Sequence, residues 1–211
     1  MEPRTTPLSG RRAQAARNDQ LILEAARVVF TADPQAPIAT VADRAGVGIA
    51  ALYRRYRSKD ELLQRLASDG LRRYVAEAEA ALADDGDPWA AFTRFLHHSL
   101  DAGAGSLTVR LAGKFTATQE MQDLGRTAFS LTRRLLDRTK ATGALRPDIG
   151  VGDVSLLLEQ LQAIRVDDQQ RSDQLRHRYL ALILDGLHLP AGSPLPGPPP
   201  TTEEIRRRYD G

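Results

Sequence analysis

The stretch from Thr40 to Leu63, TVADRAGVGIAALYRRYRSKDELL, constrains the fold more than any other part of this sequence. Thr40 belongs to the residue types that cap helix N-termini, and Asp43 three residues later is a weak form of the capping box. Gly46 can end the helix, because a residue without Cβ adopts the left-handed conformation easily. We therefore expect a short helix from Thr40 to Ala45, followed by a sharp turn.

A second short helix is expected from Ile49 to Tyr56. Its apolar residues recur at helical spacing, and we expect four of them to face the core: Ile49, Leu52, Tyr53 and Tyr56. The outward face is small and basic, and consists of Ala50, Ala51, Arg54 and Arg55. Eight residues span about 12 Å, comparable to the width of a DNA major groove. Ser58 and Glu61 then form an S-x-x-E capping box for the next helix.

The rest of the chain is also predicted to be helical. Asn18 can cap a helix that ends before Asp33-Pro34, and the helix that begins at Ser58 is expected to run to about Ala83. Five further helices are expected: one capped by Asp87 that ends at Gly103, one from Leu107 to about Ala117, one from Met121 to about Thr142, one capped by Asp153, and one capped by Ser172 or Asp173. No stretch alternates like a strand for more than a few residues, so we expect an all-α fold.

The helices group into regions of different character. We expect residues 1–16 to form a disordered basic arm, 17–66 a small helical domain, 67–189 a larger helical domain, and 190–211 a Pro-rich tail. The arm either reaches into a DNA minor groove or serves as a solubilising tail. The last residues of the tail are expected to form a loose helical turn or to stay disordered.

The charge is distributed unevenly along the chain. Arg4 to Arg65 contains 11 Lys and Arg against 6 Asp and Glu, a net charge of +5, while Leu66 to Gly211 has 18 against 20, a net charge of −2. The first third is therefore the part suited to a polyanion, although a solvated basic face would give the same count. No run of about 18 apolar residues and no signal peptide is present, so we expect a cytoplasmic protein with no membrane partner.

Few residues are suited to catalysis or metal binding. The sequence has no cysteine, which removes thiolate chemistry and cysteine zinc sites. Adjacent His97 and His98 point about 100° apart on a helix, and no Glu is followed three residues later by His. Gly103 to Ser106 matches neither a P-loop nor a nucleophile elbow, so we interpret it as a turn. We expect no enzyme activity, no metal and no cofactor.

Aromatic residues concentrate in the region from Trp89 to Phe129. Such a stripe is typical either of an apolar ligand pocket between helices or of ordinary core packing. The candidate pocket residues are Trp89, Phe92, Phe95, Leu96, His98, Phe115, Met121 and Phe129. His98 would be a ligand contact, or a surface or satisfied core histidine.

The last two helices are apolar on more than one side. Two such faces require a second covering surface, which either a second subunit or the monomer itself can provide. The candidate dimer contacts are Leu157, Leu161, Ile164, Leu180, Ile183, Leu184 and Leu187.

The order and spacing of the motifs resemble the N-terminal domain of TetR-family transcriptional repressors over residues 17–66. The resemblance rests on the motifs Val28-Val29-Phe30, Ala45-Gly46-Val47, Leu52-Tyr53 and Ser58-Lys59-Asp60-Glu61-Leu62-Leu63. The break Gly143-Ala144-Leu145-Arg146-Pro147-Asp148 is similar to the C-terminal domains of the SbtR-like branch. The resemblance implies a homodimer that binds double-stranded operator DNA through one helix-turn-helix per subunit and releases it when a small molecule binds the C-terminal domain.

The family pattern also implies roles for individual residues. Thr40 and Lys59 would hold phosphates, the Tyr53 hydroxyl would contact a phosphate, and Arg55 would contact a phosphate or a base. The residues implied at base edges are Gly48, Ile49, Ala50, Ala51 and Arg54. The family often has Ser or Thr at position 48 and Thr at position 51, so this chain lacks a cap and a hydroxyl contact. These departures leave an alternative, a helical ligand- or protein-binding module whose helix-turn-helix has lost its DNA role.

Overall fold

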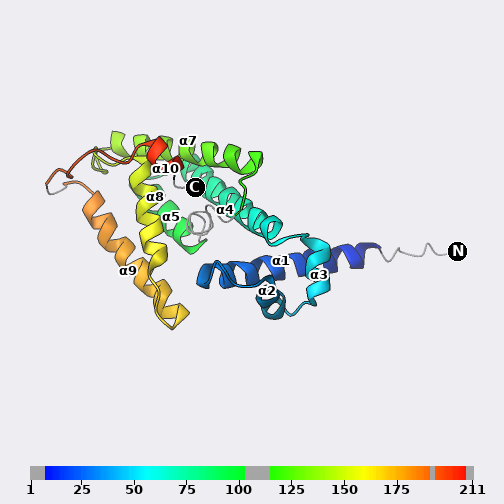
Figure 1. Cartoon of the computed structure of the whole chain (residues 1–211). Helices are drawn as coiled ribbons and strands as arrows, with labels where there is room; N and C mark the ends of the chain where they lie inside the picture. The colour runs from blue at the N-terminus through cyan, green and yellow to red at the C-terminus, as the bar shows by residue number, and fades with distance from the viewer. Residues whose placement is uncertain (1–7, 103–114, 191–192, 208–211) are drawn as a thin grey trace. The chain divides into compact units, whose positions relative to one another are not determined.

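A computed structural model of the protein describes residues 8–102, 115–190 and 193–207 (Figure 1). These residues form nine α helices and no strand, which confirms the all-α prediction. The chain divides into two compact units, Met1–Leu66 and Ala67–Gly211. Within the described ranges, none of the helices has the length and apolar character needed to cross a membrane.

The first unit contains α1 (Leu8–Ala32), α2 (Ile38–Ala45), α3 (Ile49–Arg55) and the start of α4 (Lys59–Ala83). Its core is formed by fully buried side chains, which include Phe30, Val41, Leu52, Leu62 and Leu63. The prediction for the start of the first helix was wrong. The helix begins at Leu8, and Asn18 lies inside it, where the side-chain amide of Gln14 donates to it at 2.9 Å. Residues 8–16 of the expected arm are thus helical, and residues 1–7 lie outside the described residues.

The second unit contains α5 (Pro88–Asp101), α7 (Gln119–Ala141), α8 (Val151–Ala163), α9 (Gln169–Leu187) and α10 (Thr202–Arg207). Its core joins side chains from α4, α5, α7, α8 and α9, with Phe92, Phe95, Leu135, Leu145 and Leu180 almost fully buried. Most of the helix expected from Leu107 to Ala117 lies outside the described residues.

Two of the expected helix caps are shifted. Gly150 is the N-cap of α8, and the Asp153 carboxylate accepts the Gly150 backbone N–H at 2.7 Å from the third helical position. Asp168 caps α9 through the Gln170 N–H, and Ser172 lies one turn further, buried. Both helices start earlier than expected because an acidic residue satisfies the first free N–H groups there.

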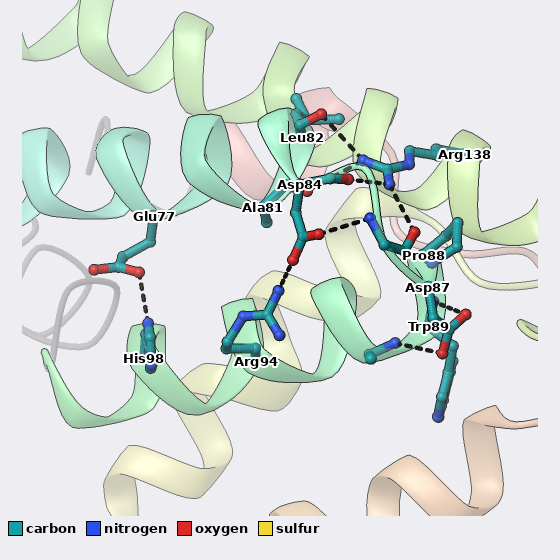
Figure 2. Close-up of polar contacts among 12 residues, drawn as sticks. Glu77, Ala81, Leu82, Asp84, Asp87, Pro88, Trp89, Arg94, His98 and Arg138 are labelled. Atoms are coloured by element: carbon teal, nitrogen blue, oxygen red, sulfur yellow. Dashed lines mark hydrogen bonds and ion pairs between the residues drawn. The ribbon is translucent and has the colours of Figure 1, made fainter.

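Figure 2 shows how the end of α4 is fixed to its neighbours. The guanidinium of Arg138 on α7 donates to the carbonyls of Ala81 at 3.2 Å and Leu82 at 3.0 Å, and also to that of Asp84. The carbonyls of the last turn of a helix, here those of Ala81 and Leu82, accept no hydrogen bond from within the helix. The Arg138 guanidinium supplies the missing donors, and it also binds the carbonyl of Asp84 just after the helix. Asp87 then caps α5, as the sequence predicts, by accepting the N–H groups of Trp89 and Ala90.

The Pro-rich tail packs against the start of α8. Asp148 accepts two hydrogen bonds from Arg146 and one from the Leu195 N–H at 3.0 Å, and Arg146 also donates to the Ser193 carbonyl at 3.0 Å. A Cβ on Gly152 would lie 2.6 Å from the Pro200 carbonyl oxygen, so glycine is required for this approach. The described part of the tail, residues 193–207, is therefore part of the folded second unit.

Candidate nucleic-acid interface

The turn between α2 and α3 has the geometry that the sequence predicts. Gly46 has a φ of 65°, which is the left-handed region, and the Val47 N–H returns to the Ala42 carbonyl at 3.0 Å. The start of α2 differs from the prediction. The helix begins at Ile38 after Pro37, so Thr40 is an exposed residue of its first turn and not the cap. Its N–H instead bonds the Pro37 carbonyl at 3.1 Å.

α3 packs on the core through a narrower stripe than expected. Leu52 is fully buried and Tyr56 is 4% exposed, but Ile49 is 43% and Tyr53 48% exposed. The prediction that all four face inward was wrong for Ile49 and Tyr53, because a seven-residue helix presents only one row of side chains to its support. The outward face therefore contains Ile49 and Tyr53 as well as the predicted Ala50, Arg54 and Arg55.

Gly48 begins α3 without a side-chain cap. Its carbonyl accepts the N–H groups of Ala51 at 2.8 Å and Leu52 at 3.1 Å. Its φ of −64° is open to any residue, and a Cβ built there meets no atom within 4 Å. The local structure therefore does not require glycine at this position.

Arg55 at the end of α3 pairs with an acidic residue of α1. Its Nε and Nη2 donate to the two carboxylate oxygens of Asp19 at 2.8 and 3.0 Å. The Tyr56 hydroxyl donates to the same carboxylate at 2.5 Å. The hydrogen bond from Arg55 is the largest influence on Asp19 and lowers its pKa, whereas burial opposes the shift. Burial, followed by the bond to Asp19, raises the pKa of Tyr56.

Lys59 anchors the loop between α1 and α2. Its ammonium donates to the carbonyls of Pro34 at 3.1 Å and Ala36 at 2.9 Å and lies 5.0 Å from the centre of the Phe30 ring. An ammonium has three N–H donors, so one remains for the predicted phosphate. The predicted capping box is formed in one half only: the Ser58 hydroxyl accepts the Glu61 N–H at 3.1 Å. In the other half, the Glu61 carboxylate accepts the N–H of Arg57, one residue before the expected N–H of Ser58.

Most predicted DNA contacts lie on the surface of the first unit. The exposed ones are Thr40, Gly48, Ile49, Ala50, Tyr53, Arg54 and Arg55, while Ala51 and Lys59 are partly buried. Asp19 could not be predicted as part of this face, because it lies 36 positions from Arg55 and no local pattern connects the two. DNA contact by these residues remains a prediction.

The predicted pocket residues mostly serve the core of the second unit. Phe92, Phe95 and Leu96 belong to its apolar cluster, which favours the core-packing alternative for these three. Met121 is buried, whereas Trp89, Phe115 and Phe129 are partly buried. His98 is exposed and bonds Glu77 at 2.7 Å, which favours a surface role (Figure 2).

The predicted dimer contacts fall into two groups. Leu161, Leu180, Leu184 and Leu187 are buried in the monomer core, which favours the alternative of cover by the monomer for these four. Leu157, Ile164 and Ile183 are only partly buried. The exposed apolar side chains of α9 are others, Tyr179 at 47% and Leu182 at 57%.

A helix-turn-helix with an exposed basic second helix, joined to a larger helical unit, is the arrangement typical of DNA-binding regulators. Residues 22–66 match the model of bacterial regulatory proteins of the tetR family, and residues 87–189 match the C-terminal domain of SbtR-like transcriptional regulators. The chain belongs to the TetR family of transcriptional regulators and is not an enzyme.

Solved structures of similar fold come from this family. The regulator LfrR from Mycobacterium smegmatis, in complex with proflavine, is 24% identical with a TM-score of 0.65, over 85% of this chain and 99% of that one. A TetR regulatory protein from Mycobacterium vanbaalenii is 28% identical with a TM-score of 0.57, over 84% and 99%. SCO0520 from Streptomyces coelicolor is 24% identical with a TM-score of 0.56, over 82% and 99%. A search of curated proteins found no match.

Proposed function

We propose that the chain is a homodimeric repressor that binds an operator through α3 and leaves it when a small molecule binds the second unit. The observation that carries the DNA-binding role is the outward face of α3. Arg54 and Arg55 are exposed there beside Ala50, which has only a methyl group, so a base edge can approach closely. Arg54 makes no ion pair with any residue that the structure describes, and its full charge remains available.

The surface of α8 and α9 supports the dimer. The two helices lie side by side (Figure 1) and border an open groove of about 360 Å³. The apolar residues lining this groove are Ile149, Leu156, Leu157, Ile183, Leu187 and Leu195. With exposed Tyr179 and Leu182 on α9, this is an apolar surface suited to a second copy. In a dimer, the α3 helix of each subunit would be its recognition helix, and the dimer would set the distance of about 34 Å between them that successive major grooves require.

The effector is proposed by analogy with a protein of the same fold. LfrR was solved with proflavine, and this is a precedent for small-molecule binding. Release requires only that the ligand bind more tightly to a state in which the two recognition helices no longer match the groove spacing.

Selection of bound fragments from genomic DNA tests the proposal, followed by affinity measurements on the selected sequence. Arg54→Ala should lower the preference for that sequence, and Lys59→Ala should weaken binding to all DNA alike. Arg126→Ala, an exposed arginine of α7, is the matched control and should leave both affinities unchanged. Light scattering should give the mass of a dimer. Failure to enrich any sequence, or a monomeric mass, would refute the proposal.

A further inference from the structure

The ion pair between Asp19 and Arg55 connects α1 with the end of the recognition helix. Neither the sequence motifs nor the family match predicts this ion pair. The Asp19 side chain is only 12% exposed, whereas that of Arg55 is 57% exposed. The carboxylate accepts three hydrogen bonds, two from Arg55 and one from Tyr56, so it is a fixed, well-satisfied anchor.

The pairing uses one edge of the Arg55 guanidinium and leaves another free. Arginine has five N–H donors in a planar fork. Nε and one N–H of Nη2 point at Asp19, so the two N–H groups of Nη1 and the second of Nη2 remain. This free end of the fork can donate two parallel hydrogen bonds to one acceptor pair, such as O6 and N7 of guanine.

The carboxylate also changes what Arg55 contributes electrostatically. A cation that is already paired attracts phosphates weakly, because its charge is largely compensated at close range. Its hydrogen-bond donors keep their direction, and the rigid anchor reduces the number of orientations they can take. An arginine held this way is suited to base-specific hydrogen bonding and poorly suited to non-specific binding of DNA phosphates.

We propose that Asp19 is a positioning residue for sequence recognition, which orients Arg55 toward a base edge and withholds its charge from non-specific phosphate binding. This inference rests on the proposed DNA-binding function. Asp19 acts through Arg55 and need not touch DNA itself.

The test compares the wild type with Asp19→Asn, which keeps the shape of the side chain and removes its charge. Affinities for the selected operator and for an unrelated duplex are measured over a range of salt concentrations. In Asp19→Asn, the freed Arg55 should add about one phosphate contact on the unrelated duplex, which steepens the slope of log affinity against log salt by about one. The preference for the operator should fall roughly tenfold, within the range that one bidentate base contact contributes.

Three further variants separate positioning from a structural role. In an Arg55→Ala background, Asp19→Asn should no longer change the salt slope. Tyr56→Phe removes one hydrogen bond to Asp19 but keeps the ion pair, so its salt slope should match the wild type. Glu24→Gln releases Arg27 on the same helix with the same change of charge, and should leave the operator preference unchanged.

Weaker binding of Asp19→Asn to both duplexes, without a steeper slope, would overturn the inference and indicate a structural role only. If the wild type prefers the operator over the unrelated duplex and Asp19→Asn shows the same preference, the inference is overturned but the proposed function is not. A folded wild type that shows no preference for any sequence would overturn both.

Discussion

Replacing Leu52 by Ala should destabilise α3 far more than replacing Ile49 by Ala, although both residues lie on the same short helix. Leu52 is fully buried, so its truncation loses apolar burial and leaves a cavity, at a cost of about 2–5 kcal/mol. Ile49 is 43% exposed and borders solvent, so its truncation should cost about 1 kcal/mol or less. A helix of seven residues cannot persist without such an anchor.

Amide hydrogen exchange measures this difference locally. The opening free energy of residues 49–56 should fall by the larger amount in Leu52→Ala, while that of α5 in the second unit provides an internal reference. Equal losses in the two variants would contradict the assignment of Leu52 inward and Ile49 outward.

Three other changes test local features. Gly152→Ala should displace the tail, because the new Cβ would lie 2.6 Å from the Pro200 carbonyl oxygen, and amide hydrogen exchange in residues 193–207 should accelerate. Gly125→Ala is the control, since a Cβ there has open space around it and should leave the exchange rate of the tail unchanged. Gly48→Ser should raise the melting temperature slightly, since a serine cap is worth a few tenths of a kcal/mol over glycine, and a lower melting temperature would contradict the open N-cap. Burial, and then the charge of His177, lowers the pKa of His97. The unfolded chain therefore binds more protons below pH 6.5, so stability should fall there as pH decreases, and less steeply in His97→Gln; identical profiles would contradict this.

The environment of His97 includes other titratable groups. Its Nδ1 lies 3.0 Å from Nδ1 of His177, whose Nε2 bonds Asp101 at 2.6 Å, and His98 is adjacent in sequence. Asp101 raises the pKa of His97 and so reduces the expected effect. Melting curves at pH 7.5 and 5.5 for the wild type and His97→Gln measure it.

Local signals in the sequence determine much of this fold. The glycine at position 46, the Ser58 cap and the Asp87-Pro88 start of α5 each act within a few residues, and each appears where the sequence predicts it. The prediction that Thr40 caps α2 was wrong, because Pro37 and buried Ile38 start the helix one turn earlier. Both positions are acceptable helix starts by residue type, so the sequence alone could not show which of the two is used.

Long-range contacts account for what the sequence could not predict. Helical spacing marks Leu52 and Ile49 as equivalent, and only the support beneath α3 distinguishes them. The same holds for Leu180 and Leu184, whose periodicity fits a dimer surface although the monomer buries them. The pairing of Asp19 with Arg55 has no sequence signature, since it depends on where α1 passes α3.

A charge reversal on the outward face of α3 tests most directly whether that face meets DNA. Ala50 lies in the middle of that face and is exposed, so Ala50→Glu should place a carboxylate among the phosphates without disturbing the core. Ala80→Glu, at an exposed position of α4, adds the same charge in the second unit and serves as the control. Affinity for the selected operator should be lost in Ala50→Glu and retained in Ala80→Glu, with both variants folded. Retained affinity in a folded Ala50→Glu variant would show that this face does not meet DNA.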